Sequence, residues 1–133
     1  MERYSKVILS NMCMVYNDNN EILVQMRIKK DWGGLTFPGG HVEDNESLIE
    51  SVIREMKEET GLIIKNPRLV GVYEWPWENN SRYLAFLYKT NEYEGDILSS
   101  KEGEVFWIKK ENIKDYKLST DFEDIFNIMN KEK

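Results

Sequence analysis

The sequence predicts an α+β protein with a mostly antiparallel sheet, and three observations support this. Short runs rich in aliphatic and aromatic residues alternate with turn residues, which indicates several strands. Two segments repeat apolar residues at helical spacing, one mid-chain and one at the end. The 133 residues are 41% hydrophobic and 12% aromatic, enough for one domain with its own core. We therefore expect residues 1–133 to form a single domain.

Two apolar segments at the start of the chain are predicted to be strands. Residues 7–16 and 21–28 are rich in aliphatic residues, and the turn-forming residues 17–20 separate them. This order predicts a hairpin. Cys13, the single cysteine, lies within the first apolar run and cannot form an internal disulfide. A small core residue fits that setting better than a nucleophile does.

A bend leads into the central helix. Pro38 is followed by two glycines, which marks a tight turn where the backbone approaches another group closely. Residues 46–60 then place their apolar side chains on one broad arc, as in a helix packed on a sheet. Asp44 or Asn45 is predicted to cap this helix, and Gly61 to end it.

Three glutamates lie at one border of the apolar arc of that helix. Glu55, Glu58 and Glu59 are spaced three and four residues apart, so their carboxylates crowd together. Each such like-charge pair destabilises a helix by roughly 0.2–0.5 kcal/mol. A hard divalent cation such as Mg²⁺ would neutralise them, whereas the alternative is an ordinary solvated acidic face. The cluster alone favours the solvated face.

The next strands are predicted to form a second hairpin. Residues 68–77 and 83–90 read as strands around a turn, and Pro76 favours an edge position or a strand end for the first of them. Trp75 and Trp77 are two residues apart and therefore share one face. They could stack on a nucleobase, although packing within the protein is the commoner use of such a pair.

The end of the chain adds one more strand and a closing helix. Residues 105–108 form the strand, and residues 109–115 can form a short helical turn. Residues 120–130 repeat apolar side chains at helical spacing, which predicts an amphipathic helix.

Charge and composition narrow the classes of partner. A net charge of −6 argues against a nucleic-acid polymer, which needs a basic surface. A small phosphorylated ligand stays compatible, because a bound metal can supply positive charge locally. No signal peptide, membrane span, Walker loop or Rossmann fingerprint is evident, so we expect a cytoplasmic protein.

The residues that frame the three glutamates resemble the signature of the Nudix hydrolases. That signature is G, five residues, E, seven residues, and then R-E-U-x-E-E-x-G-U, where U is a bulky apolar residue. Nine specified positions over 23 residues are matched without departure, which is a strong signal. The matching residues are Gly40, Glu46, Arg54, Glu55, Met56, Glu58, Glu59, Gly61 and Leu62.

The resemblance covers most of the chain and implies both a fold and a metal site. The implied fold is an α/β/α sandwich, a mixed sheet with one helix on each face. The implied cofactor is Mg²⁺, or Mn²⁺ in its place, and the implied work of Arg54 is to hold signature glutamates in position. The implied metal ligands are the carbonyl of Gly39 and the carboxylates of Glu55, Glu58, Glu59 and Glu102. The same four glutamates are the implied catalytic residues, and Glu104 is the alternative to Glu102.

Several further roles follow from the same resemblance. Either Glu55 or Glu102 is expected to accept the proton of the attacking water. His41 could be a general base, but the family does not use its slot that way, so a structural role is favoured. The resemblance implies Arg27 for phosphate and Asp121 at the purine edge, and Phe37 and Trp75 are further candidates for substrate binding. Asp121 or Thr120 could instead cap the last helix.

The compact layout resembles the MutT group, which hydrolyses oxidised nucleoside triphosphates such as 8-oxo-dGTP to the monophosphate and pyrophosphate. Other family members cleave ADP-ribose, nucleotide sugars or dinucleoside polyphosphates with the same signature. A nucleotide sensor that binds without cleaving is a further alternative, but such domains generally lose signature glutamates that this chain keeps. Related enzymes are often dimers, so a homodimer is compatible with the resemblance.

Overall fold

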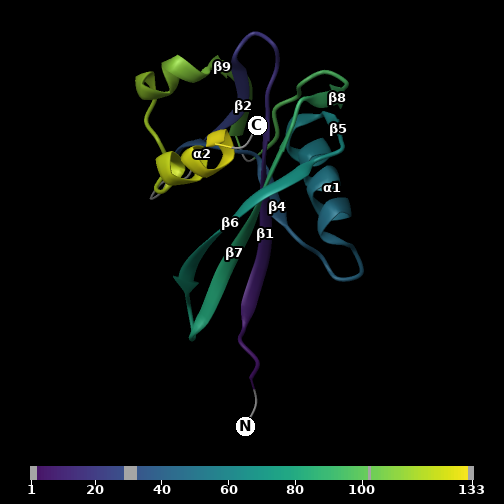
Figure 1. Cartoon of the computed structure of the whole chain (residues 1–133), viewed down its shortest axis with the longest axis vertical. Coiled ribbons are helices and arrows are strands. Elements are labelled where there is room, and N and C mark those ends of the chain that lie inside the picture. The colour runs from purple at the N-terminus through teal and green to yellow at the C-terminus, as the bar shows by residue number, and fades with distance from the viewer. Residues whose placement is uncertain (1–2, 29–32, 102, 132–133) are drawn as a thin grey trace.

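The computed structural model describes residues 3–28, 33–101 and 103–131, and its strands and helices form an α+β fold (Figure 1). This confirms the predicted fold class. The elements are β1 (Val7–Val15), β2 (Glu21–Arg27), β3 (Gly34–Thr36), β4 (Gly39–His41), α1 (Leu48–Thr60), β5 (Ile63–Lys65), β6 (Arg68–Trp77), β7 (Ser81–Thr90), β8 (Glu92–Glu94), β9 (Gly103–Lys109), the 3₁₀ helix η1 (Lys110–Asp115) and α2 (Phe122–Lys131).

The largest sheet is mixed and has the strand order β4-β1-β7-β6. β1 runs parallel to β7 over its whole length, from Val7 opposite Arg82 to Val15 opposite Thr90. β4 is antiparallel to β1, and β6 is antiparallel to β7. A second sheet has the order β3-β2-β9, and β5 pairs with β8. The single parallel pair is what makes the main sheet mixed.

The predicted hairpin between the first two strands is wrong. β1 has β4 on one edge and β7 on the other, while β2 pairs with β3 and β9 in a different sheet. An isolated bridge from Tyr16 to Ile22 joins them at the turn. Both edges of β1 are occupied by strands distant in sequence, so the turn at 17–20 carries the chain from one sheet to the other.

The predicted hairpin of the second pair is confirmed. β6 and β7 are antiparallel neighbours, with Trp75 opposite Tyr83 and Pro76 opposite Arg82. β6 lies at the edge of its sheet. Pro76, which has no N–H to donate, is therefore tolerated within the strand.

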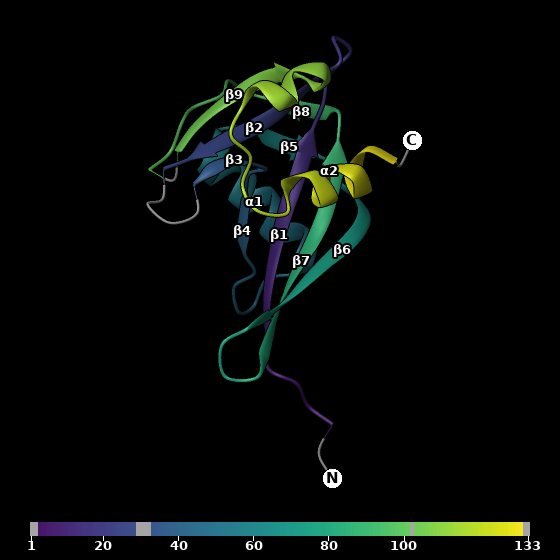
Figure 2. The ribbon, with the colours of Figure 1, turned by 90° about the vertical axis from the view of Figure 1, so that its left-hand side faces the viewer.

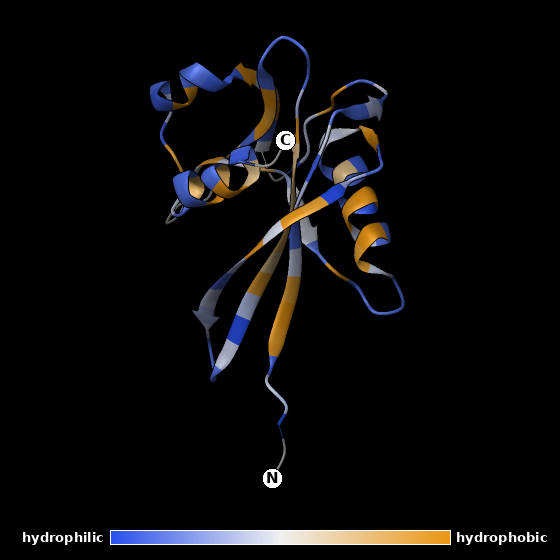
Figure 3. Ribbon diagram, in the orientation of Figure 1, coloured by the Kyte–Doolittle hydropathy of each residue, from blue (hydrophilic) through white to orange (hydrophobic). Residues whose placement is uncertain are grey.

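Two apolar cores lie on opposite faces of the main sheet, as the sandwich requires (Figures 1 and 2). Alternate residues of β1 serve them: Met14 packs with the α2 core, whereas Cys13 and Val15 pack with the α1 core. Figure 3 shows hydrophobic segments along the central strands and on both helices. The burial of Cys13 confirms that it is a core residue.

The ends of α1 explain its position. Its N-cap is Ser47, whose side chain accepts a hydrogen bond from the Glu50 amide, while Glu50 bonds back to the Ser47 amide. The prediction of Asp44 or Asn45 as the cap is therefore wrong: this reciprocal capping box needs a hydroxyl three residues before a glutamate. Gly61 ends the helix in a left-handed conformation with φ of 83°, as predicted.

Beyond the helices, the lower ends of β1, β6 and β7 extend together as an arm (Figures 1 and 2). Across the described ranges, no helix is both long and apolar enough to cross a membrane.

Candidate active site

The two adjacent glycines let β4 lie against both β1 and α1. A Cβ atom on Gly39 would overlap the backbone carbonyl of Asn11, and one on Gly40 would overlap the carboxylate of Glu55. Side chains at these positions would therefore separate β4 from its neighbours. The backbone at Pro38-Gly39-Gly40 was predicted to approach another group closely, and it does so. On the helix, the group that it approaches is Glu55.

Asn11 fixes this approach from the sheet side, and sequence reasoning missed it. Its side-chain oxygen accepts from the Gly40 amide at 3.1 Å, and its side-chain nitrogen donates to the Ser51 hydroxyl at 2.9 Å. Asn11 is 3% exposed. One amide thus joins β4 to α1. A polar residue inside a largely apolar strand was the signal for it.

Arg54 is the centre of the charge network at the start of the site. Its guanidinium donates two bonds to Glu46, at 2.8 and 2.9 Å, and approaches both oxygens of Glu58 at 3.2 Å. It also lies 3.2 Å from Glu55 and donates to the His41 carbonyl at 3.0 Å. The predicted role of Arg54, holding signature glutamates in position, matches these contacts.

The electrostatics of the site depend on how crowded these groups are. Burial raises the pKa of Glu55, the neighbouring Arg54 opposes the rise, and Glu58 and Glu59 add to it. Hydrogen bonding to Arg54 lowers the pKa of Glu46 to about 2. Glu46 is therefore held ionised by its arginine, whereas Glu55 carries negative charge in a place that disfavours it.

Glu59 has one partner on β2 and one in the segment that precedes β9. Its Oε1 accepts a hydrogen bond from Gln25 Nε2 at 3.1 Å and from the Ser100 hydroxyl at 3.3 Å. Gln25 is on β2 and is fully buried. Neither partner was predicted; for Gln25, as for Asn11, the sequence signal was a polar side chain within a largely apolar strand.

The donor chemistry of the site suits a hard divalent cation. Glu55, Glu58 and Glu59 are close together on α1, and Gly40 of β4 lies against the carboxylate of Glu55. Across the described ranges, no three acidic, histidine or cysteine side chains yet converge as a ligand shell. Both oxygens of Glu58 face Arg54, so this carboxylate would have to turn to reach an ion beside Glu55, whereas Glu59 is held at Oε1 by Gln25. Glu102 lies outside the described residues, and Glu104 is exposed on β9.

An aromatic group on β6 and β7 lines the arm. Trp75 stacks on Tyr83 with ring centroids 4.7 Å apart, and Trp77 meets the edge of the same ring. The Tyr83 hydroxyl hydrogen-bonds to His41. Burial raises the pKa of Tyr83, an effect that the nearby Arg27 opposes. Of the residues predicted to bind substrate, Trp75 therefore stacks on Tyr83, and Arg27 lies near enough to act electrostatically on its hydroxyl.

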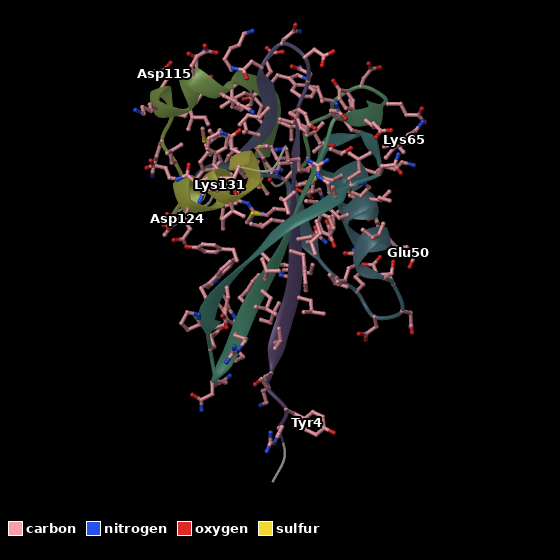
Figure 4. The ribbon with its side chains drawn as sticks, viewed as in Figure 1. Tyr4, Glu50, Lys65, Asp115, Asp124 and Lys131 are labelled. Carbon is pink, nitrogen blue, oxygen red and sulfur yellow. The ribbon has the colours of Figure 1, made fainter. Side chains whose placement is uncertain are left out.

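The other two predicted substrate residues are placed differently. Phe37 is 1% exposed and stacks on Phe122 at 4.7 Å in the α2 core. Asp121 precedes α2 in a left-handed conformation, close to the hydroxyl of Tyr73. Figure 4 labels Asp124 in the first turn of the same helix, and Tyr73 donates to it at 3.4 Å. Figure 4 also shows Glu50 on the outer side of α1, far from Asp124 on α2.

The comparison with protein families decides what this site belongs to. The NUDIX domain family matches residues 8–127. The chain belongs to the Nudix family. Nudix hydrolases generally use a divalent metal such as Mg²⁺, in agreement with the donor set described above.

Three similar proteins place this Nudix domain among its relatives. An uncharacterized Nudix hydrolase of Bacillus subtilis (strain 168), YvcI, is 35% identical over 100 residues, which is 71% of this chain and 61% of that protein. An ADP-ribose pyrophosphatase of Methanocaldococcus jannaschii is 43% identical over 63 residues, 47% of this chain and 37% of that protein. This Nudix domain therefore spans less than two thirds of the length of either relative.

A solved structure extends the likeness to the whole fold. The crystal structure of the MutT protein from Bacillus halodurans superposes with a TM-score of 0.76 at 29% identity, covering 91% of this chain and 79% of that one. The arrangement of α1, α2 and the mixed sheet is thus the Nudix fold.

Proposed function

We propose that this Nudix domain hydrolyses a nucleoside diphosphate-linked substrate with the help of Mg²⁺, or of Mn²⁺ in its place. The observation that carries the proposal is the position of Glu55. Its carboxylate lies against the bare backbone of Gly40, beside Glu58 and Glu59, and its pKa is raised. We propose Glu55, Glu58, Glu59, Glu102 and the carbonyl of Gly39 as the groups that hold the cation.

Each part of the site has a separate task in this proposal. The bound cation would neutralise diphosphate oxygens and lower the pKa of the attacking water. Arg54 keeps Glu46 and Glu58 in place through its hydrogen bonds. Arg27 would meet substrate phosphate. Either Glu55 or Glu102 would accept the proton of the water; the raised pKa of Glu55 increases its affinity for a proton, which suits this role.

We propose 8-oxo-dGTP, or a related oxidised nucleoside triphosphate, as the substrate, with the monophosphate and pyrophosphate as products. The likeness to the Bacillus halodurans MutT protein supports this choice. The half-exposed rings of Trp75 and Trp77 beside Tyr83 offer a flat surface for a base, and Asp121 offers a hydrogen-bond acceptor.

ADP-ribose is the second candidate. It is favoured by the 43% identity to the archaeal ADP-ribose pyrophosphatase, which exceeds the identity to the MutT protein but covers less of the chain. Nucleotide sugars and dinucleoside polyphosphates follow. Three predictions from the sequence remain: a single catalytic domain, a homodimer and a cytoplasmic location. A sensor that binds a nucleotide without cleaving it remains the alternative to a hydrolase.

The test is Mg²⁺-dependent turnover of a panel containing 8-oxo-dGTP, dGTP, the ordinary nucleoside triphosphates, ADP-ribose and diadenosine polyphosphates. Glu58→Gln is the control, because the Glu58 side chain is 57% exposed and its change should not unfold the protein. We expect 8-oxo-dGTP to give the highest kcat/KM and the variant to be inactive. A higher value for ADP-ribose would reassign the substrate, and no turnover of any compound would favour the sensor.

A further inference from the structure

A fully buried amide lies beneath the acidic border of α1. Gln25 is in the middle of β2, paired with Thr36 of β3 on one side and with Val105 of β9 on the other. Its side chain has 0% exposure. A buried amide needs partners for its donors and its acceptor, because water cannot supply them freely.

The orientation of this amide is fixed by Glu59. Gln25 Nε2 lies 3.1 Å from Glu59 Oε1, and an ionised carboxylate only accepts hydrogen bonds, so the nitrogen must face it. The Ser100 hydroxyl donates to the same oxygen at 3.3 Å. Within the described part of the chain, both bonds go to Oε1 and none to Oε2 of Glu59. The carboxylate is thus held by one oxygen while the other is left for a further ligand.

The acceptor of the same amide has no partner among the described residues. Gln25 Oε1 is buried and makes no hydrogen bond to any described residue. Since the oxygen and nitrogen belong to one planar amide, Oε1 lies within about 5 Å of the Glu59 carboxylate. Buried polar atoms without partners are rare and call for an explanation. A hydrogen-bond donor that enters the site together with a cation bound to Glu59 would give Gln25 Oε1 its missing partner.

We propose that Gln25 is a positioning residue of the cation site, an inference that rests on the cation-binding part of the proposed function. Its nitrogen holds Glu59 by one oxygen, which would leave Oε2 to face the ion, and its oxygen would accept a hydrogen bond from a water that the ion brings with it. Mg²⁺ keeps several waters when it binds to proteins. Groups that orient metal ligands in this way typically change metal affinity by about 10- to 100-fold.

A structural role would give the same contacts but different behaviour. The bond between Gln25 and Glu59 could simply tie β2 to the end of α1. Its loss would then lower stability and leave cation affinity unchanged. If Gln25 serves the cation, removing the amide weakens cation binding and relieves the buried unpaired oxygen, so the metal-free protein is at least as stable as before.

The experiment is a titration of the metal-free protein with Mn²⁺ in the absence of nucleotide, in which electron paramagnetic resonance measures the concentration of free Mn²⁺. Gln25→Met keeps the volume of the side chain and removes both polar atoms. Thr90→Val is the matched control, because Thr90 is 3% exposed and its hydroxyl bonds to the Lys65 carbonyl, away from α1's acidic border. Thermal unfolding of the metal-free proteins is measured in parallel.

We expect Gln25→Met to bind Mn²⁺ about tenfold more weakly with an unchanged or higher metal-free Tm. Thr90→Val should lower Tm and bind Mn²⁺ as the wild type does. Ser100→Ala, which removes the second donor to Glu59, should give a smaller loss of affinity. Mn²⁺ binding by Gln25→Met within twofold of wild type would overturn the inference.

Two further outcomes separate this inference from the proposed function. If Gln25→Met does not fold, Gln25→Asn withdraws the same amide by one methylene, and normal Mn²⁺ affinity in that variant would equally overturn the inference. If the wild type cleaves no nucleotide but Gln25→Met still binds Mn²⁺ more weakly than the wild type does, the inference is supported and the hydrolase function is rejected. Absence of Mn²⁺ and Mg²⁺ binding by the wild type would reject both.

Discussion

At the residue scale, the site depends on one arginine that several acceptors share. Arg54 makes hydrogen bonds to Glu46, Glu58 and the His41 carbonyl, so it joins the loop before α1, the helix and β4. These contacts raise the pKa of Arg54 and keep it charged. Its strongest partner is Glu46, which receives two parallel bonds.

The Glu46 pair predicts a pH dependence of stability. The pKa of Glu46 falls from 4.5 to about 2 on folding, so ionised Glu46 stabilises the folded protein above pH 4.5. That stabilisation is lost as the pH falls from about 4.5 through about 2. We expect the Tm of wild type to exceed that of Glu46→Gln near pH 6 and the two to converge toward pH 2. A Tm difference that stays constant over this range would contradict the assignment.

The paired glycines predict two different defects. Gly39→Ala places Cβ on the Asn11 backbone, which cannot yield, so we expect a loss of stability on the order of 3 kcal/mol. Gly40→Ala instead meets the end of the flexible Glu55 side chain and displaces it. We expect this variant to lose less than about 1.5 kcal/mol but about 100-fold in kcat/KM. Urea unfolding and turnover of the best substrate measure both quantities.

At the element scale, α1 carries the acidic residues, and its ends determine how firmly they are presented. The capping box of Ser47 and Glu50 satisfies amides at the start of the helix, and Gly61 closes its end. Between these ends, Val52 and Met56 are buried against the sheet, so the border with Glu55, Glu58 and Glu59 is fixed in rotation. The helix is thus anchored by its caps and by one face.

The cap gives a prediction with a control beside it. Ser47→Ala removes the side-chain acceptor for the Glu50 amide and should cost about 1 kcal/mol in the free energy of unfolding. Asp44→Ala should change that free energy by less than about 0.5 kcal/mol, because Asp44 is exposed and does not cap the helix. Urea unfolding of both variants tests this. Equal losses would show that the cap is assigned to the wrong residue.

At the scale of the whole molecule, the two cores meet at the central strands of the main sheet. β1 contributes alternate side chains to both, so neither core can open without disturbing β1 or its neighbours. Cys13 is fully buried on the α1 side, and burial raises the pKa of its thiol.

Cys13 therefore serves as a probe of global unfolding. The native thiol should not react with Ellman's reagent, since it is both inaccessible and protonated. As urea increases, the fraction of Cys13 thiol that reacts should rise over the same urea range in which the tryptophan fluorescence changes, because both signals report one cooperative transition. Reaction well before the fluorescence change would show that β1 opens locally and would contradict the coupling of the two cores.

The sequence alone was sufficient to predict the helix with the acidic border, the family resemblance and the second hairpin. These rest on local features: the period of α1, the spacing from Gly40 to Leu62, and a turn between neighbouring strands. The same local reasoning misjudged the N-cap by two or three residues, because several residues able to cap precede α1.

The tertiary structure alone decided the pairing of β1 with β7, which replaced the hairpin expected from the turn at 17–20. It also placed Asn11 beside Gly40 and Gln25 beside Glu59. Such pairs join residues 29 and 34 positions apart, so no local pattern contains them. Strand pairing and buried hydrogen bonds depend on which distant segments can pack together, and that is a property of the whole fold.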